Sequence, residues 1–161
     1  ACRGGYEWFL RRFPEGETEY QDALNALAED DRPNDANWLM DHAGPDINAV
    51  LEVETITNCK HFFAAGRLII KTNAITAGHL RAGRGIKAGG GIEAGWGIEA
   101  GRGIEAGGGI EAGGGMGIFA GLRVRVNQWA LYAQVITMTK PKNLVSGSWV
   151  EPAVKSEQEA A

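Results

Sequence analysis

A six-residue repeat runs without interruption through the middle of this 161-residue chain. From residue 80 to residue 115 the sequence reads LRAGRG, IKAGGG, IEAGWG, IEAGRG, IEAGGG, IEAGGG. In an extended strand, the aliphatic residue and the alanine two positions later point to one face, and the residue between them points to the other. The glycines that follow give the backbone freedom for a corner. A strand of three residues and a corner of three, repeated at a short fixed period, predict a parallel β-helix. The glycine content excludes an amphipathic helix, and the glycine spacing excludes a collagen-like one.

The variable corner position indicates how many repeats form one coil. It is occupied in turn by Arg84, Gly90, Trp96, Arg102, Gly108 and Gly114. Three repeats per coil, an offset of eighteen residues, bring two identical pairs together, whereas two repeats per coil bring none. We therefore predict a mainly β fold, a triangular coil with stacked isoleucines inside and Ile98 among the most buried.

The same offset makes predictions about charge. It places Arg81 beside Glu99 and Lys87 beside Glu105, which are favourable cross-strand pairs. It also places Glu93 beside Glu111, a like-charge pair that only water or a partner's cation relieves.

The period continues less regularly outside the central stretch. Upstream, Phe63, Ile69 and Ile75 keep the six-residue spacing and suggest further interior positions. Downstream, Met116 and Gly117 form a two-residue insertion before the motif resumes. Residues 124–139 are rich in β-branched and aromatic residues, which favours additional strands.

The first fifty residues predict a different structure. Thr18 and Gln21 have the spacing of a capping box ahead of a helix that runs to about Asp30. A second helix, capped by Asn34 or Asp35, is expected to stop at the Gly-Pro of residues 44–45. Such a helical hairpin would cover the N-terminal end of the β-helix. The expected organisation is a helical cap over 1–50, the β-helix and terminal strands over 51–139, and a C-terminal tail over 140–161.

Charge divides unevenly along the chain, whose formal net charge is −4. Residues 1–60 hold 13 acidic side chains against 5 basic ones, and the remainder is mildly basic. This asymmetry favours head-to-tail association or a basic partner for the cap. A cap that is merely soluble explains it equally well. Acidic and basic residues balance within the repeats, which argues against mimicry of DNA phosphates by their outward glutamates. We expect no nucleic acid partner.

No targeting or membrane signal stands out. The sequence contains no apolar run long enough to span a membrane and no signal-peptide core, so we expect a cytoplasmic protein without membrane contact. The two cysteines, Cys2 and Cys59, match no zinc spacing and no disulfide framework.

Candidate catalytic groups are sparse. His79 is the one histidine inside the repeats, and we interpret it as a corner residue facing water. Cys59 and His61 share a strand face, but no acid can be assigned to orient them. The sequence therefore predicts no catalytic residue, no metal site and no cofactor.

Trp96 is the most conspicuous candidate for an interaction surface. It projects from a corner position that carries glycine in three other repeats, and Arg84 and Arg102 occupy the same position in nearby repeats. Trp and Arg dominate the energetics of protein interfaces. With Glu93 and Glu111 these residues form the candidate interface. The alternative is that Trp96 packs against its own coil.

The IEAGxGIEAG repeats resemble those of uncharacterised bacterial and prophage-associated glycine-rich proteins, in which a segment similar to Asn37-Trp-Leu-Met also precedes the repeat. The β-helix is broadly similar in style to that of bactofilins, whose coils stack end to end without nucleotide. Hexapeptide-repeat acyltransferases match less well, because their small inward residue follows the aliphatic one by four positions rather than two.

These resemblances imply three classes of function. The first, which we favour, is a non-catalytic binding or assembly protein that acts on a protein partner or on itself, with a phage-derived inhibitor of a bacterial defence complex as one specific form. The second is a filament-forming structural protomer, and the third an acyltransferase with His79 at a subunit interface. A homo-oligomer, a dimer or trimer, is expected.

Overall fold

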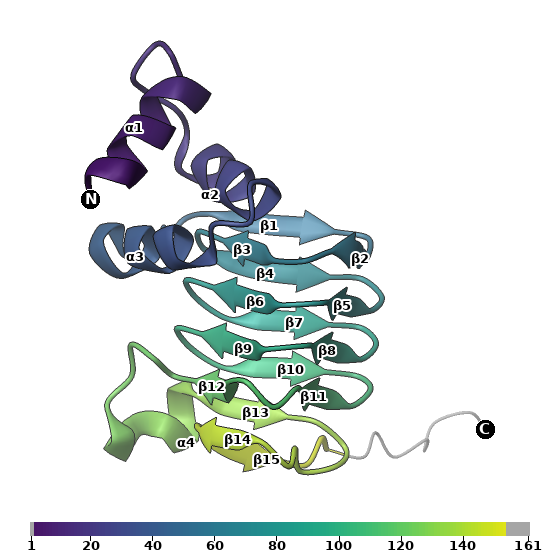
Figure 1. The fold of residues 1–161 in the computed structure, drawn as a ribbon. Coiled ribbons are helices and arrows are strands. Elements are labelled where there is room, and N and C mark those ends of the chain that lie inside the picture. Colours follow the sequence, from purple (N-terminus) through teal and green to yellow (C-terminus); the bar gives the residue numbers. More distant parts are fainter. Residues whose placement is uncertain (1, 154–161) are drawn as a thin grey trace, which may run out of the picture.

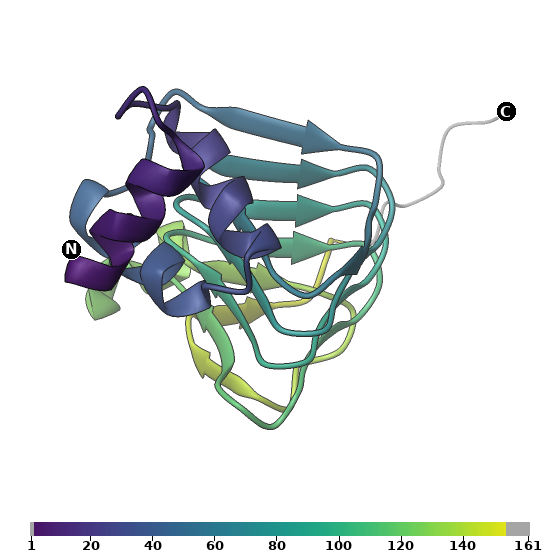
Figure 2. The same cartoon turned by 45° about the horizontal axis from the view of Figure 1, so that its top comes forward.

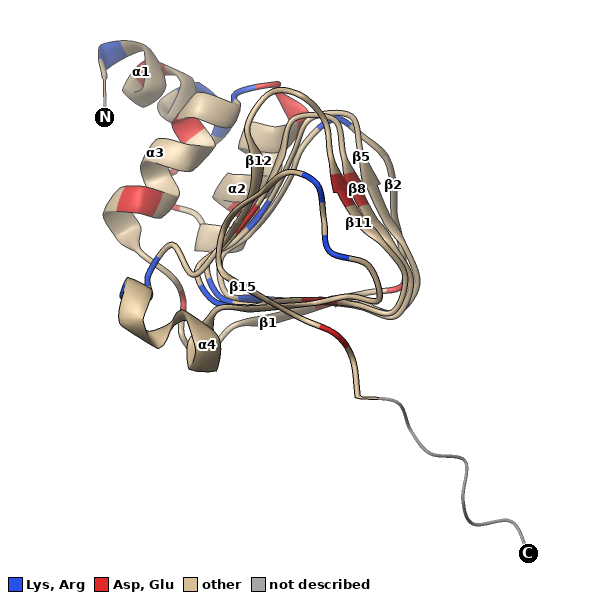
Figure 3. Ribbon diagram, turned by 90° about the horizontal axis from the view of Figure 1, so that it is seen from below, with Lys and Arg blue, Asp and Glu red and all other residues tan. Residues whose placement is uncertain are grey.

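The computed structural model describes residues 2–153 and confirms a parallel β-helix, called the solenoid below, with helices at its N-terminal end (Figure 1). Each complete coil contributes one strand to each of three parallel sheets. Viewed along the stacking axis, the coils have a triangular outline (Figure 3).

The three sheets are named here sheet A, sheet B and sheet C. Sheet A contains β1 (Val50–Val53), β4 (Arg67–Ile70), β7 (Ile86–Ala88), β10 (Ile104–Ala106), β13 (Gln134–Ile136) and β15 (Ser148–Val150). Sheet B contains β2 (Ile56–Cys59), β5 (Ala74–Thr76), β8 (Ile92–Ala94) and β11 (Ile110–Ala112). Sheet C contains β3 (Phe62–Ala64), β6 (His79–Ala82), β9 (Gly97–Ala100), β12 (Gly117–Ala120) and β14 (Leu144–Ser146).

Strand register confirms three repeats per coil. Ile86 pairs with Ile104 and Leu80 with Ile98, each eighteen residues apart. The side chain of Ile98 is fully buried, as predicted. The insertion before Ile118 is also confirmed, because Ile118 pairs with Ile98 across a coil lengthened to twenty residues.

The predicted charge pairs form. Lys87 Nζ lies 3.2 Å from Glu105 Oε1, and Arg81 Nε lies 3.5 Å from Glu99 Oε2. Glu93 stands opposite Glu111 in the register of sheet B.

The upstream phase predicted from the sequence is wrong by one residue. Eighteen residues before Leu80 lies Phe62, not Phe63, and the two are paired in register. Alternation along each strand therefore turns Phe63 and Ile75 away from the interior. Ile75 is 47% exposed and pairs with Glu93, while Ile69 pairs with Lys87. Leu68 and Ile70 fill the interior instead.

The repeat glycines meet a different need from the one expected. None of the glycines between residues 80 and 115 has a positive φ, so left-handed backbone is not what they supply. A Cβ at Gly101 would overlap the carbonyl oxygen of Gly83, and one at Gly107 would overlap that of Gly89. The first glycine of each corner is therefore required by the close approach of successive coils.

Three helices precede the solenoid, one more than the predicted hairpin: α1 (Arg3–Arg12), α2 (Tyr20–Glu29) and α3 (Pro33–Ala43). The capping box was wrong. Glu19 is the N-cap of α2, and no side chain caps it. Pro33 occupies the first turn of α3, a position at which its missing N–H costs no hydrogen bond. Trp8, Leu24, Leu27 and Met40 form the core of this region.

The helical region covers part of the solenoid's end and one of its sides. Helix α2 contacts β3 at the first coil, and Figure 2, with that end turned forward, shows the helices grouped over one side of the triangle. The side chain of Gln21 makes two hydrogen bonds to the backbone at β3. Its Nε2 donates to the Phe63 carbonyl (2.7 Å), and its Oε1 accepts from the Ala65 N–H (2.9 Å).

The C-terminal part of the fold departs from a purely strand-rich expectation. Between residues 124 and 139 lie a short 3-10 helix (Val126–Gln128), helix α4 (Trp129–Tyr132) and strand β13. Strands β14 and β15 continue the solenoid beyond residue 139. Residues 154–161 of the expected tail lie outside the described residues.

Candidate functional site: an arginine-lined groove on sheet A

The structure brings some of the sequence-predicted interface residues together and separates others. Arg84 and Arg102 occupy the corner between sheets C and A in adjacent coils, and the Arg102 N–H faces the Arg84 carbonyl at 3.4 Å. Trp96 lies at the corner between sheets B and C. Glu93 and Glu111 are on the outer face of sheet B. The two arginines thus share a surface that contains neither the tryptophan nor the glutamates.

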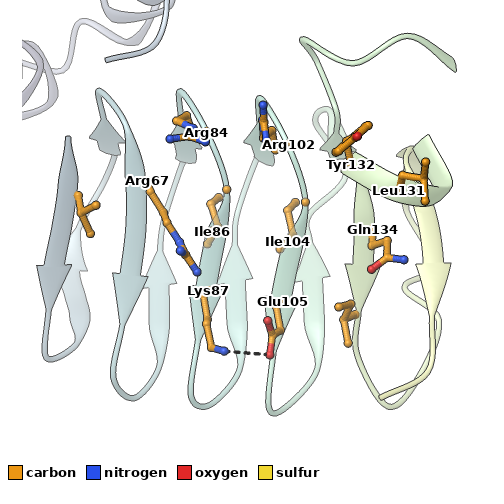
Figure 4. Close-up of a pocket in the computed structure, with 14 residues that line it drawn as sticks. Arg67, Arg84, Ile86, Lys87, Arg102, Ile104, Glu105, Leu131, Tyr132 and Gln134 are labelled. Carbon is orange, nitrogen blue, oxygen red and sulfur yellow. Dashed lines mark ion pairs between the residues drawn. The ribbon is translucent and has the colours of Figure 1, made fainter. Parts of the chain in front are cut away.

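The arginine corner borders a groove of about 400 Å³ across sheet A (Figure 4). Gly85 and Gly103 lie where the strands leave the corner, so no side chain fills this part of the groove. Gly103 cannot carry one, because a Cβ there would stand 2.7 Å from the Gln134 carbonyl oxygen. The groove therefore follows from the same close stacking that the corner glycines permit.

The groove is strongly basic. Arg67, Arg84, Arg102 and Lys87 line it, and Glu105 is the one acidic side chain among the described lining residues. Lys87 and Glu105 form an ion pair with each other. The three arginines are left as its uncompensated charge.

Two of the arginines are oriented by contacts within the protein. Arg84 Nη1 donates to the Ile47 carbonyl at 2.6 Å. The guanidinium of Arg102 lies 5.8 Å from the centre of the Tyr132 ring, within cation–π range. Arg67 is exposed and reaches from β4 toward β7 in Figure 4.

Helix α4 supplies an apolar wall. It stands beside the arginine corner (Figure 3) and contributes Leu131 and Tyr132, which are 72% and 48% exposed. Trp129 anchors this segment, since its Nε1 donates to the Val124 carbonyl at 3.2 Å. The groove thus offers cationic and apolar contacts side by side.

Sequence reasoning missed Arg67, Leu131 and Tyr132. A signal for Arg67 exists, because it lies eighteen residues before Gly85 and so on the same edge as the other two arginines. No comparable signal exists for α4, which interrupts the repeat and whose position depends on tertiary packing.

The expectation for His79 is corrected by its burial. The residue is 5% exposed, and its ring lies between those of His61 and Trp96, with centroid distances of 5.4 and 5.5 Å. Burial, with smaller effects of His61 and Arg81, lowers the pKa of His79. A buried ring of this kind is poorly placed to act as a base on a substrate. Trp96 itself covers this ring while remaining 57% exposed.

His61 joins the same stack to the helical region. Its Nδ1 accepts the backbone N–H of His79 at 3.1 Å, so in the neutral ring the proton lies on Nε2, 2.8 Å from Asp31 Oδ1. Lys60 pairs with the other oxygen of the same carboxylate. Hydrogen bonds from Lys60 and then His61 hold the pKa of Asp31 below its usual value.

A second cluster links the helices to sheet C. Arg81, buried on β6, donates to Asn37 at 2.8 Å and to Asp41, both on α3. Glu99 lies beside it on β9, and burial raises the pKa of Glu99 more than Arg81 lowers it. These titratable groups connect the helical region to the solenoid.

Among residues 2–153, no group of three His, Cys, Asp or Glu side chains is arranged to hold a metal ion. Within the same range, no helix has the length and hydropathy that crossing a membrane requires.

The architecture defines a parallel β-solenoid protein with an N-terminal helical region. The model of the YdhT N-terminal domain matches residues 1–43, a segment that ends at the last residue of α3. Comparison with curated proteins and with solved structures gave no match.

Proposed function

We propose that this chain is a non-catalytic binding protein that presents the sheet A groove to a protein partner. The observation that carries the proposal is the combination of three arginines with exposed Leu131 and Tyr132 around one groove. Arginine and tyrosine are enriched at protein interfaces, where they supply directional hydrogen bonds and large contact area. The strands beneath the groove are paired with their neighbours on both sides, so binding requires no rearrangement of that backbone.

The test compares two forms of the full chain as immobilised baits. Arg84→Glu with Arg102→Glu reverses the charge of the corner, and circular dichroism verifies that the solenoid remains folded. A partner recovered by the wild type and lost by this variant supports the proposal. Identical recoveries by the two baits contradict it.

A specific form of this function is inhibition of a bacterial defence complex by a phage-derived protein. The similarity of the repeats to those of prophage-associated proteins, the small size and the acidic composition support it. Expression of the chain in a bacterium that carries a defence system should then raise the plating efficiency of a phage that the system restricts. Unchanged plating across several defence types would contradict this form while leaving the groove proposal intact.

Self-assembly is the second candidate. Strands β1 and β15 terminate sheet A, and in the described part of the chain no strand pairs with their outer edges. Free edges of this kind template the addition of further strands. Light scattering over increasing concentration, with electron microscopy, tests for the dimer, trimer or filament that this candidate requires. A monomer at tens of micromolar would contradict it.

A further inference from the structure

The arginines of the groove are arranged as a ladder along the solenoid axis. Arg84 and Arg102 each lie two residues before a paired isoleucine, and Arg67 lies one residue before Leu68 of the preceding coil. One arginine is therefore contributed by each of three successive coils. Because adjacent strands are separated by about 4.8 Å, the ladder advances by about that distance per coil.

The chemistry around the ladder limits the kind of ligand that fits. Lys87 and Glu105 neutralise each other, so the remaining charge of the groove is that of its arginines. A ligand with negative charges would complement it. Leu131 and Tyr132, exposed beside the arginines, call for apolar surface on the same ligand. A nucleic acid strand offers no aliphatic surface to Leu131, and the chain's net charge of −4 opposes a long polyanion.

We infer that the groove binds an acidic amphipathic helix of a partner protein. Side chains at positions i and i+4 of a helix lie about 5–6 Å apart, close to the spacing of the arginine ladder. A row of glutamates would meet Arg67, Arg84 and Arg102, and guanidinium groups bind carboxylates through paired hydrogen bonds. Apolar side chains on the adjacent helix face would pack on Leu131 and Tyr132, as helices do in other peptide-binding grooves. The inference rests on the proposed protein-binding function and specifies its ligand.

The size of the groove agrees with this mode of binding. A volume of about 400 Å³ accommodates several side chains rather than a whole helix. The ligand helix would therefore lie across the surface, with one face inserted and the other exposed. Its charges would remain partly screened, which makes binding dependent on salt.

The experiment uses synthetic helical peptides with the full-length chain. The probe carries glutamates at i, i+4 and i+8 and leucines on the neighbouring face. One control has the same composition with the glutamates moved off the common face, and another replaces each glutamate by glutamine. Fluorescence anisotropy measures the dissociation constants at low ionic strength and at about 0.15 M salt. An oligothymidylate carrying the same number of charges serves as the nucleic acid control.

The aligned peptide is expected to bind at least about tenfold more tightly than either control peptide, and more weakly as salt rises. Arg67→Gln and Arg102→Gln should each weaken it several-fold, and together by more than about tenfold. Arg11→Gln is the matched control. It removes the same charge from an exposed position on α1 and should leave affinity unchanged.

Three results would overturn the inference: equal affinity for aligned and misaligned peptides, insensitivity to both groove variants, or tighter binding of the oligothymidylate. The inference can fail while the proposed function holds. If the charge-reversed bait loses a partner that the wild type retains while the peptides do not bind, the groove binds protein and the acidic-helix ligand is wrong.

Discussion

The solenoid and the helical region are stabilised by different kinds of contact. In the solenoid, each coil repeats the one before it, so isoleucine stacks on isoleucine and glycine on glycine. The helical region has no such repetition. Phe63 and Ala65 of the first coil belong to its apolar core. The polar side chains of Gln21, Asp31 and Arg81 make further contacts between the two regions. Stability in the solenoid is therefore distributed over many equivalent positions, whereas attachment of the helices depends on a few side chains.

The largest expected effect is a charge placed inside the solenoid. Ile98→Asp introduces an unpaired carboxylate at a fully buried position and should lower the free energy of unfolding by about 4–5 kcal/mol or more. Chemical denaturation followed by circular dichroism measures the change. Ile75→Asp is the matched control on the outer face of sheet B, where the carboxylate stays hydrated. Because it faces Glu93, it should cost up to about 1 kcal/mol, far less than Ile98→Asp. Equal destabilisation by both would contradict the assignment of inner and outer faces.

Arg81→Met should have the next largest effect, because it leaves Glu99 buried without its cation. Removing one member of a buried charged pair costs about 3–5 kcal/mol. The double variant Arg81→Met with Glu99→Leu should recover most of that loss, since both charges are then removed. Thermal and chemical denaturation of the two single variants and the double variant give the coupling. A double variant no more stable than Arg81→Met would mean that the link to α3 dominates.

Gln21→Ala tests attachment of the helices directly. It removes two hydrogen bonds to the edge of β3 and should destabilise that contact by about 1–3 kcal/mol. Hydrogen exchange should then accelerate in α2 and β3 while the central coils stay protected. Gln128→Ala, at an exposed position, is the control. Faster exchange throughout the solenoid would show that the two regions unfold as one unit.

The smallest expected effect is the dependence of stability on pH. The pKa of His79 is lowered in the folded state, so the unfolded chain binds its proton first and stability should decline as pH falls below about 6.5. One proton limits the slope to about 1.4 kcal/mol per pH unit. His79→Gln should flatten this part of the profile.

Two carboxylates shape the profile at lower pH, in opposite directions. Because the pKa of Asp31 is lowered in the folded state, its carboxylate stabilises the fold at pH values above its usual pKa of 3.8. This contribution is lost as the pH falls further. The raised pKa of Glu99 acts in the other direction, because protonation of Glu99 favours the folded state. Glu99→Gln removes this opposing contribution, so the variant should lose stability more steeply on acidification than the wild type does. If His79→Gln leaves the decline of stability below about pH 6.5 unchanged, the assignment for His79 is contradicted.

The repeat alone determined much of the solenoid, because each residue of a coil contacts its equivalent eighteen residues away. The interior isoleucines, the pairs Arg81–Glu99 and Lys87–Glu105, and the insertion before Ile118 all follow from that offset. The regular pattern weakens before residue 80, where a step of one residue decides which face is inside. The prediction there placed Ile75 inside instead of Ala74.

Tertiary structure decided the features that no local period encodes. The local sequence predicts that Gln21 belongs to a capping box. In the structure its amide instead hydrogen-bonds the backbone at β3, more than forty residues away. His79 reads as a corner residue facing water, yet the rings of His61 and Trp96 bury it from either side. The groove combines both kinds of information. The alignment of Arg84 and Arg102 follows from the eighteen-residue offset of the repeat. The apolar wall exists because α4 packs beside the corner, and contacts between distant segments arise from packing rather than from the sequence of either one.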